Sequence, residues 1–437
     1  MRQLFFVCTV MILCTACSSD SSDTRSPIRV EIEHTEDGYR LLRAGEPYAV
    51  HGAGMVINDI ERFAASGGNS IRTWNTAYEG QDMGQLLDDA HTHGVTVAMG
   101  LPMGHERHGF DYDDQQAVAE QLEFMRGEVL KYRDHPAVLV WVIGNELNLQ
   151  YENPRVWDAV NDVAEMIDEL DPYHPTTTTT AGFNPAVNAE ILARAPAVDF
   201  IGFQMYSSIF RFPEWLAEDG FDRPFMVTEW GTIGYWEVPT TDWGAPIEVH
   251  SSDKAGRYLR AYRDILEPLE GQLIGTYAFY WGQKQERTPT WFGMLSEERH
   301  LTEAVDAMQY AWTREWPDNR TPQVFGMLLD GQTSADSVTL KEGQVVEASV
   351  DVRDPDGDPV VFRWEIKPES TATTGGGDYE APITNLEGFL SDPTAATTTL
   401  TAPPPGQYRL FAYAEDAEPR IAHANIPFLV ESEGASE

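Results

Sequence analysis

The sequence predicts an α/β fold in which a (β/α)8 barrel is followed by a C-terminal immunoglobulin-like β-sandwich. From residue 30 to residue 320, short β-branched or aromatic runs alternate with longer amphipathic runs, which is the pattern of parallel βα units. From residue 321 to residue 437 the helical periodicity disappears, and short alternating runs are separated by turns rich in Gly, Pro and Thr. A chain of 437 residues is long enough for two such domains.

Eight short runs in the first domain are predicted strands. They span residues 48–52, 70–74, 95–99, 138–143, 176–180, 199–203, 224–228 and 274–279. Helical patterns lie between them, for example at residues 115–132, 154–170 and 252–269. Eight strands over roughly 280 residues match the size of a (β/α)8 barrel. A doubly wound sheet is the structural alternative, but no Gly-rich phosphate loop follows the first strand.

The second domain is predicted to be all-β. Residues 344–350 and 360–366 alternate apolar and polar side chains, as strands of a sandwich do. Between them lies a turn at residues 354–358, Asp354-Pro-Asp-Gly-Asp358, whose alternate carboxylates could converge on a calcium ion. Its Gly is at the fourth place rather than the sixth of an EF-hand loop, which favours a turn held by bonds from Asp side chains to the backbone.

The composition excludes several classes of protein. Seventy acidic residues against 30 basic ones give a formal net charge of −40, so the surface would repel nucleic-acid phosphates. Hydrophobic residues make up 42% of the chain, which is too many for a disordered protein. The three cysteines are Cys8, Cys14 and Cys17, so the body of the chain has none for a disulfide framework, a zinc cluster or a nucleophile.

Residues 1–16 are predicted to be an export signal. Arg2 precedes a mostly apolar run over residues 4–16, which is shorter than the about twenty residues of a membrane-spanning helix. The sequence Leu-Cys-Thr-Ala-Cys at residues 13–17 resembles a bacterial lipoprotein signal cleaved before Cys17. This resemblance implies lipid on Cys17, a tether over residues 17–29, and anchoring at the outer membrane or cell surface of a bacterium, with membrane contact through the lipid alone. An ordinary secretory peptide cleaved nearby is the alternative.

Two carboxylates lie where predicted barrel strands end. The fourth strand leads into Gly144-Asn145-Glu146, and the seventh leads into Thr-Glu229-Trp-Gly. Catalytic groups of such barrels project from the C-terminal ends of the strands. A retaining glycosidase needs one carboxyl group to protonate the leaving oxygen and another to attack the anomeric carbon. Solvated acids are the plain alternative in so acidic a chain, but two at this spacing favour catalysis.

These two strand ends resemble the signature of clan A glycoside hydrolases, a superfamily of retaining enzymes with (β/α)8 barrels. The resemblance covers roughly residues 40–312 and implies that Glu146 is the acid/base and Glu229 the nucleophile. It also implies that Asn145 hydrogen-bonds the sugar 2-hydroxyl. An exported barrel followed by one immunoglobulin-like domain most resembles the endo-β-1,3-glucanases of family 158. The fifth strand lacks the histidine that several cellulase-like members place there, which disfavours a standard cellulase site.

Other strand-end residues are candidates for substrate binding. Arg72 ends the second strand, where a guanidinium near Glu229 would favour the charged form of that carboxylate. Tyr206 ends the sixth strand, where it is either a donor to Glu229 or a core residue. Trp281 follows the eighth strand and is predicted to form an apolar floor for the reacting sugar, with an ordinary core residue as the alternative. Three further candidates for sugar contacts are Trp74, Trp230 and His105, and a solvated loop residue is the equal alternative for the histidine.

The sequence therefore predicts a retaining β-glycosidase that cuts a β-glucan, specifically an endo-β-1,3-glucanase, without a metal or an organic cofactor. An exo-acting or transglycosylating β-glycosidase of the β-galactosidase or β-mannanase type is the first alternative. A non-catalytic glycan-binding surface lipoprotein is the second. The expected partners are a polysaccharide or oligosaccharide, with no nucleic acid, and the expected oligomeric state is a monomer.

Overall fold

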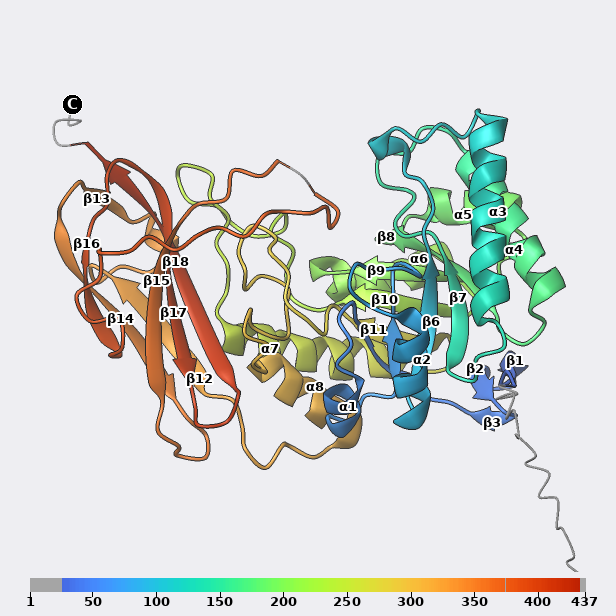
Figure 1. The fold of residues 1–437 in the computed structure, drawn as a ribbon, viewed down its shortest axis with the longest axis horizontal. Helices are drawn as coiled ribbons and strands as arrows, with labels where there is room; N and C mark the ends of the chain where they lie inside the picture. Colours follow the sequence, from blue (N-terminus) through green and yellow to red (C-terminus); the bar gives the residue numbers. More distant parts are fainter. Residues whose placement is uncertain (1–25, 374, 433–437) are drawn as a thin grey trace, which may run out of the picture.

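Parallel strands close into an eight-stranded barrel in this computed structural model, which describes residues 26–373 and 375–432 (Figure 1). Around the barrel the strands follow the chain order, so the predicted (β/α)8 topology is confirmed. Every predicted strand overlaps one of them. They are β4 (His51–Gly54), β5 (Ser70–Arg72), β6 (Thr96–Leu101), β7 (Val138–Ile143), β8 (Thr176–Ala181), β9 (Phe200–Met205), β10 (Phe225–Trp230) and β11 (Leu273–Ala278).

Helices surround the barrel, and several begin at a side chain that caps them. Asp114 accepts bonds from the N–H groups of Gln116 and Ala117, which otherwise lack partners in the first turn. The helices are α1 (Ile60–Ala65), α2 (Met83–Thr92), α3 (Gln115–Tyr132), α4 (Arg155–Leu170), α5 (Pro185–Arg194), α6 (Phe212–Asp219), α7 (Ser251–Arg260) and α8 (Glu303–Thr313). The helix predicted over residues 252–269 is α7 continued by a π-helical turn, η3 (Ala261–Leu266), and a 3-10 turn, η4 (Glu267–Leu269).

The run of five threonines in β8 forms a fully internal strand. β-branched side chains suit a strand, but each buried hydroxyl needs a partner. The hydroxyl of Thr178 donates to the carbonyl of Ile143 on β7, and that of Thr177 donates to the carbonyl of Phe200 on β9. The threonines therefore fasten β8 to both of its neighbours.

A small antiparallel sheet, absent from the predicted elements, precedes the barrel. It consists of β1 (Val30–Thr35), β2 (Gly38–Arg43) and β3 (Glu46–Pro47). The N–H of Val30 donates to the carbonyl of Tyr173, and Tyr39 pairs with Gly271. Both of these partners lie in loops that enter barrel strands, so this sheet lies at the N-terminal end of the barrel. The C-terminal end of the barrel, where catalytic groups of such barrels lie, is not covered by this sheet.

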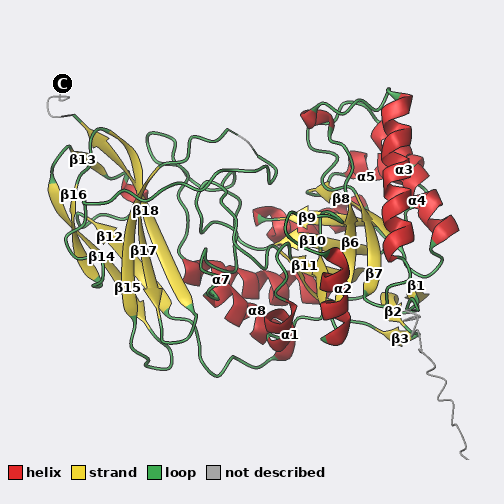
Figure 2. Cartoon of the chain, viewed as in Figure 1, coloured by secondary structure: helices red, strands yellow, loops and turns green. Residues whose placement is uncertain are grey.

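The C-terminal domain is built from two sheets that share one core (Figure 2). One sheet has the order β12-β14-β16 and the other has the order β13-β18-β17-β15. Trp364, Ile366 and Leu400 lie in the core between them. The immunoglobulin-like classification stays a prediction. The strands are β12 (Gln323–Leu329), β13 (Thr339–Lys341), β14 (Val345–Arg353), β15 (Val361–Pro368), β16 (Thr397–Thr401), β17 (Gly406–Glu415) and β18 (Ile421–Glu431); the short turn η5 (Ser334–Asp336) precedes β13.

The turn at residues 354–358 is held by its own carboxylate. Asp354 Oδ1 accepts bonds of 2.9 Å from the N–H groups of Asp356 and Asp358, which confirms the interpretation as a turn stabilised by side-chain to backbone bonds.

The predicted export signal, its lipid attachment at Cys17 and most of the tether lie outside the described residues. Within residues 26–373 and 375–432, no helix combines the length and the apolar character needed to cross a bilayer.

Candidate active site

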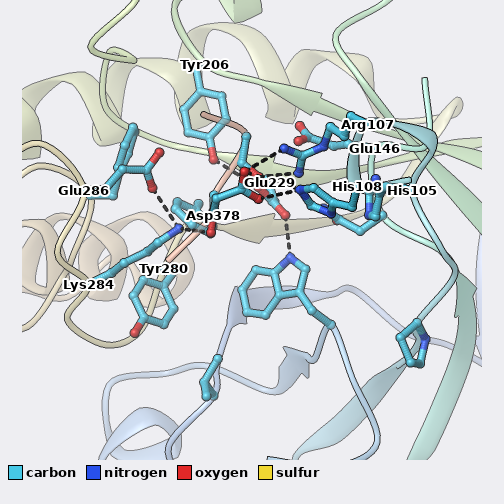
Figure 3. A pocket seen from close by; sticks show the side chains of 18 of the residues that line it. His105, Arg107, His108, Glu146, Tyr206, Glu229, Tyr280, Lys284, Glu286 and Asp378 are labelled. Atoms are coloured by element: carbon cyan, nitrogen blue, oxygen red, sulfur yellow. Dashed lines mark hydrogen bonds and ion pairs between the residues drawn. The ribbon is translucent and has the colours of Figure 1, made fainter. Parts of the chain in front are cut away.

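A cavity of about 640 Å³ opens at the C-terminal ends of the barrel strands (Figure 3). Loops that follow β4, β5, β6, β7, β9, β10 and β11 line it. Gly376, Gly377 and Asp378 from the C-terminal domain complete the lining. Both predicted catalytic residues, Glu146 and Glu229, face this cavity.

Three donors hold the Glu229 carboxylate, which lies within β10 and is only 6% exposed. Arg72 Nη1 lies 2.6 Å from Oε1, and Trp74 Nε1 donates to the same oxygen over 2.7 Å. The Tyr206 hydroxyl donates to Oε2 over 3.0 Å. These charge-assisted bonds fix the carboxylate in position at the cavity. The interpretation of Tyr206 as a donor to Glu229 is confirmed.

Glu146 follows β7 in an unusual backbone conformation. Its φ of 49° is in the left-handed region, which costs free energy in a residue with a side chain and is common at functional sites. Gly144, two residues earlier, has φ 71°, and a Cβ there would lie 2.5 Å from Leu147 Cδ1. This turn aims the Glu146 side chain into the cavity. Burial and then the negative charge of Glu229 raise the pKa of Glu146 to about 8.

Asn145 is oriented through its side-chain oxygen. Its Oδ1 accepts from Arg72 Nη2 at 2.5 Å and from Gln204 Nε2 at 2.7 Å. Since the oxygen is occupied, the amide nitrogen is the group left to donate to a ligand in the cavity. Arg72, which is fully buried, thus connects Asn145 to Glu229.

Trp74 and His105 both line the cavity, as predicted for sugar contacts. Trp74 also packs edge-on against Phe279 and Tyr280. Burial lowers the pKa of His105 to about 4, so its ring is neutral near pH 7. A neutral imidazole can donate and accept hydrogen bonds, which suits sugar hydroxyls.

Two predicted sugar contacts are wrong. Trp281 is 1% exposed, donates to Asp59 Oδ2 and packs edge-on against Phe63, so it belongs to the barrel core and not to the cavity. Phe279 and Tyr280, just before it, line the cavity instead. Trp230 is fully buried and packs against Tyr258 outside the barrel strands. Neighbours along a strand point to opposite faces, and Glu229 already points to the cavity.

A group of charged side chains at the cavity was missed from the sequence. They come from loops or from the other domain, and none follows a strand end directly: Arg107, Lys284, Glu286 and Asp378. Arg107 pairs with Asp378 at 3.0 Å, and Lys284 pairs with Glu286 at 2.8 Å. Burial raises the pKa of Glu286. No sequence spacing marks these residues, because Arg107, Lys284 and Glu286 lie within loops and Asp378 reaches the cavity only through the contact between the domains.

Within the described residues, no group of three or more His, Cys, Asp and Glu side chains is placed to hold a metal ion.

Comparison with known proteins agrees with this geometry. A family model described as "Glycosyl hydrolases family 2, TIM barrel domain" matches residues 51–234, which include both Glu146 and Glu229. No curated protein matches the chain. The resemblance to family 158 has no support from these comparisons and stays a prediction.

Two solved structures share the fold. The β-glucuronidase of Bifidobacterium dentium, complexed with coumarin-3-O-glucuronide, is 16% identical over 67% of this chain and 50% of its own, with a TM-score of 0.52. A calcium-binding mutant of Bacteroides uniformis β-glucuronidase 2 is 14% identical over 92% of this chain and 48% of its own, with a TM-score of 0.51. This chain therefore spans about half the length of these structures. The shared fold is that of a TIM barrel, and the family model that matches residues 51–234 is one of glycoside hydrolases.

Proposed function

We propose that this TIM-barrel protein is a glycoside hydrolase, specifically a retaining β-glycosidase that works by double displacement, with Glu229 as nucleophile and Glu146 as acid/base. One observation carries the proposal. Glu229 is held by three donors at the cavity, and its negative charge helps to keep a proton on Glu146. Two carboxyl groups with such different environments match the two roles that glycoside hydrolysis needs.

In the first step, Glu229 attacks the anomeric carbon while Glu146 gives its proton to the leaving oxygen. The glycosidic bond breaks as an ester forms between the sugar and Glu229. This ester removes the negative charge of Glu229, which was a cause of the raised pKa of Glu146.

In the second step, Glu146 acts as a base. It takes a proton from water, the water oxygen attacks the anomeric carbon, and the Glu229 carboxylate leaves with its charge restored. Arg72, Trp74 and Tyr206 then hold that carboxylate for another cycle. Asn145 offers an amide N–H to a hydroxyl of the sugar.

The substrate is proposed to be a neutral β-glycan. Each cation at the cavity rim has an anionic partner, Asp378 for Arg107 and Glu286 for Lys284. A uronic acid brings its own carboxylate and would have to displace one of these partners. The structures that share the fold include β-glucuronidases by name, but these ion pairs favour neutral sugars in this chain.

Internal cleavage of a β-1,3-glucan, the specificity inferred from the sequence, finds no support in the comparisons. We therefore favour an exo-acting β-glycosidase, the first alternative predicted from the sequence. It is favoured by the compact cavity, whose volume of about 640 Å³ is in the range of sites that enclose a small ligand.

A fluoroglycoside that traps the glycosyl ester tests the mechanism. A 2-deoxy-2-fluoro β-glucosyl fluoride is expected to inactivate the enzyme and to label the peptide that contains Glu229. Labelling of another residue, or an inverted first product by NMR, would overturn the mechanism. A panel of β-1,3-, β-1,4- and β-1,6-glucans, β-mannan, β-galactosides and β-glucuronides identifies the substrate. Binding to one of these without any product would show a glycan-binding protein instead.

Export and lipid anchoring at Cys17 are part of the same proposal. The test is fractionation of cells that express the chain. The wild type is expected in the membrane fraction, and C17S is expected in the soluble fraction.

A further inference from the structure

Residues 375–380 of the C-terminal domain, here called the bridging segment, cross the mouth of the barrel. On one side the segment binds the loop after β6. The carboxylate of Asp378 lies 3.0 Å from Arg107 Nη1 and 3.2 Å from His108 Nε2. Arg107 also donates to the carbonyls of Gly375 and Gly376. In Figure 3 Asp378 is drawn with these side chains around the same cavity as Glu146 and Glu229.

On the other side the bridging segment binds the loop after β11. Lys284 Nζ donates to the carbonyl of Gly377 over 2.8 Å. The carboxylate of Glu380 accepts from the N–H of Arg287 over 2.9 Å. The segment thus joins the loops after β6 and β11, two strands that β4 and β5 separate in the barrel. In Figure 1 the orange trace of this region extends from the sheets toward the barrel.

Glycines allow this close approach. Gly376 has φ 62° and Gly377 has φ 78°. A Cβ on Gly376 would lie 2.9 Å from Leu149 Cδ1, in the loop after β7, and a Cβ on Gly377 would lie 3.2 Å from Lys284 Nζ. The Gly-Gly-Gly sequence at residues 375–377 therefore serves both the backbone conformation and the contact with the barrel.

A buried polar network fixes the C-terminal domain on the barrel. Glu248 of the barrel is ion-paired with Lys254 on α7 and accepts from Asn425 Nδ2 on β18 over 2.8 Å. Arg409 on β17 donates to Asn425 Oδ1 at 2.7 Å and to the carbonyl of Pro246 at 2.8 Å. Such groups are costly to separate once buried, so this network holds the C-terminal domain against the barrel.

We propose that the bridging segment is a specificity-determining wall of the active site, which closes the cleft at one end and restricts the enzyme to chain ends and short oligosaccharides. Internal cleavage needs a cleft open on both sides of the reacting sugar. Here the segment runs from the β6 and β7 loops to the β11 loop, and Gly376, Gly377 and Asp378 line the same cavity as both glutamates. The C-terminal domain is thus a part of the substrate site. This inference rests on the proposed function.

The test compares the products of the full-length wild type with those of two variants. One variant lacks residues 375–378, and the other is D378A, which removes the ion pair with Arg107. The probes are end-labelled glucose hexasaccharides and disaccharides with β-1,3 or β-1,4 linkages. The wild type is expected to release only short products from one end. The deletion is expected to give mid-chain fragments. It is also expected to raise the ratio of kcat/KM for the hexasaccharide to kcat/KM for the disaccharide about tenfold, equivalent to about 1.4 kcal/mol. D378A is expected to change this ratio in the same direction.

Y379A is the matched control, because Tyr379 belongs to the segment but is 82% exposed and does not line the cavity. Its product pattern is expected to match that of the wild type. Internal cleavage by the wild type, or an unchanged product pattern in the deletion, would overturn the proposal. If thermal melting shows that the deletion variant does not fold, the test depends on D378A. An unchanged ratio of kcat/KM for the hexasaccharide to kcat/KM for the disaccharide in D378A would then overturn the proposal. A wild type inactive on these probes and on the whole panel of β-glycans and β-glycosides refutes the proposed function rather than the wall.

Discussion

At the scale of single residues, Arg72 organises the site. Its planar guanidinium donates to Glu229, to the carbonyl of Thr228 and to Asn145 at the same time. A lysine ammonium carries the same charge but cannot reproduce the planar fork of donors.

We expect R72K to fold and to lose about 100-fold in kcat, because Glu229 and Asn145 are no longer aligned. The measurement is kcat and KM with an aryl β-glycoside, together with a melting curve that verifies folding. A kcat within threefold of the wild-type value would show that a positive charge at this position is enough for activity, without the planar guanidinium.

The proton on Glu146 gives a second prediction at this scale. Its pKa is raised to about 8, so the general acid is protonated below that pH and loses its proton above it. We expect kcat/KM to fall as the pH rises through about 8. The unfolded chain loses this proton near the ordinary value of 4.5. The folded state therefore binds more protons between these two values, and stability decreases as the pH rises across that range.

E146Q removes this titration. Its melting temperature is expected to exceed that of the wild type at pH 8.5 by more than it does at pH 5. Equal pH dependence of melting in the two proteins would contradict a raised pKa.

Most of the residues that the sequence places correctly at the cavity lie at the end of a barrel strand or within three residues after it. The β/α rule places Glu146, Asn145, Arg72 and Tyr206 at one mouth. Trp230 fails because it neighbours Glu229 on β10 and so points away from the cavity. Asp378 could not be predicted, because its place depends on how the second domain docks on the barrel.

At the scale of elements, the contact of α7 with β18 joins the domains. Lys254 is fully buried with Glu248, and their attraction lowers the pKa of Glu248 to about 2 against the effect of burial. Removing the cation leaves a buried carboxylate without its charge partner.

We expect K254M to reduce the free energy of unfolding by about 3–5 kcal/mol. K341M is the matched control, because the pair of Lys341 with Glu431 is solvent-exposed, at 44% and 36%. Its effect is expected to be within about 1 kcal/mol. Chemical denaturation measures both. Equal effects would show that the buried pair does not stabilise the interface.

Element boundaries also show what the sequence could and could not predict. All barrel strands were found, because buried parallel strands are apolar or β-branched throughout. The sheet β1-β2-β3 was missed, because β1 and β2 carry exposed or half-buried charges such as Glu31, Glu33 and Arg40 and lack a continuous apolar run. The π-helical turn η3 has the same apolar pattern as the helix that it continues, so the sequence predicts one uninterrupted helix there.

At the scale of the whole molecule, the two domains act as one unit. Backbone bonds join Leu301 of the barrel to Pro419 and Ile421 of the C-terminal domain, beside the buried polar network. The proposed catalytic carboxylates come from the barrel, and a wall of the same cavity comes from the C-terminal domain. Domain organisation is therefore part of the proposed specificity.

The net charge of −40 gives the last prediction. With 70 acidic residues and 30 basic ones, most carboxylates cannot have a cationic partner, so repulsion among them outweighs the exposed ion pairs. Salt screens exposed charges over about 10 Å at 0.1 M and over about 3 Å at 1 M. An increase in the sodium chloride concentration from about 0.01 M to about 1 M is thus expected to raise the melting temperature. Buried pairs such as Arg72 with Glu229 are screened much less, so kcat/KM on a neutral glycoside should change little over the same range. A falling melting temperature would mean that exposed ion pairs, rather than repulsion, dominate the surface electrostatics.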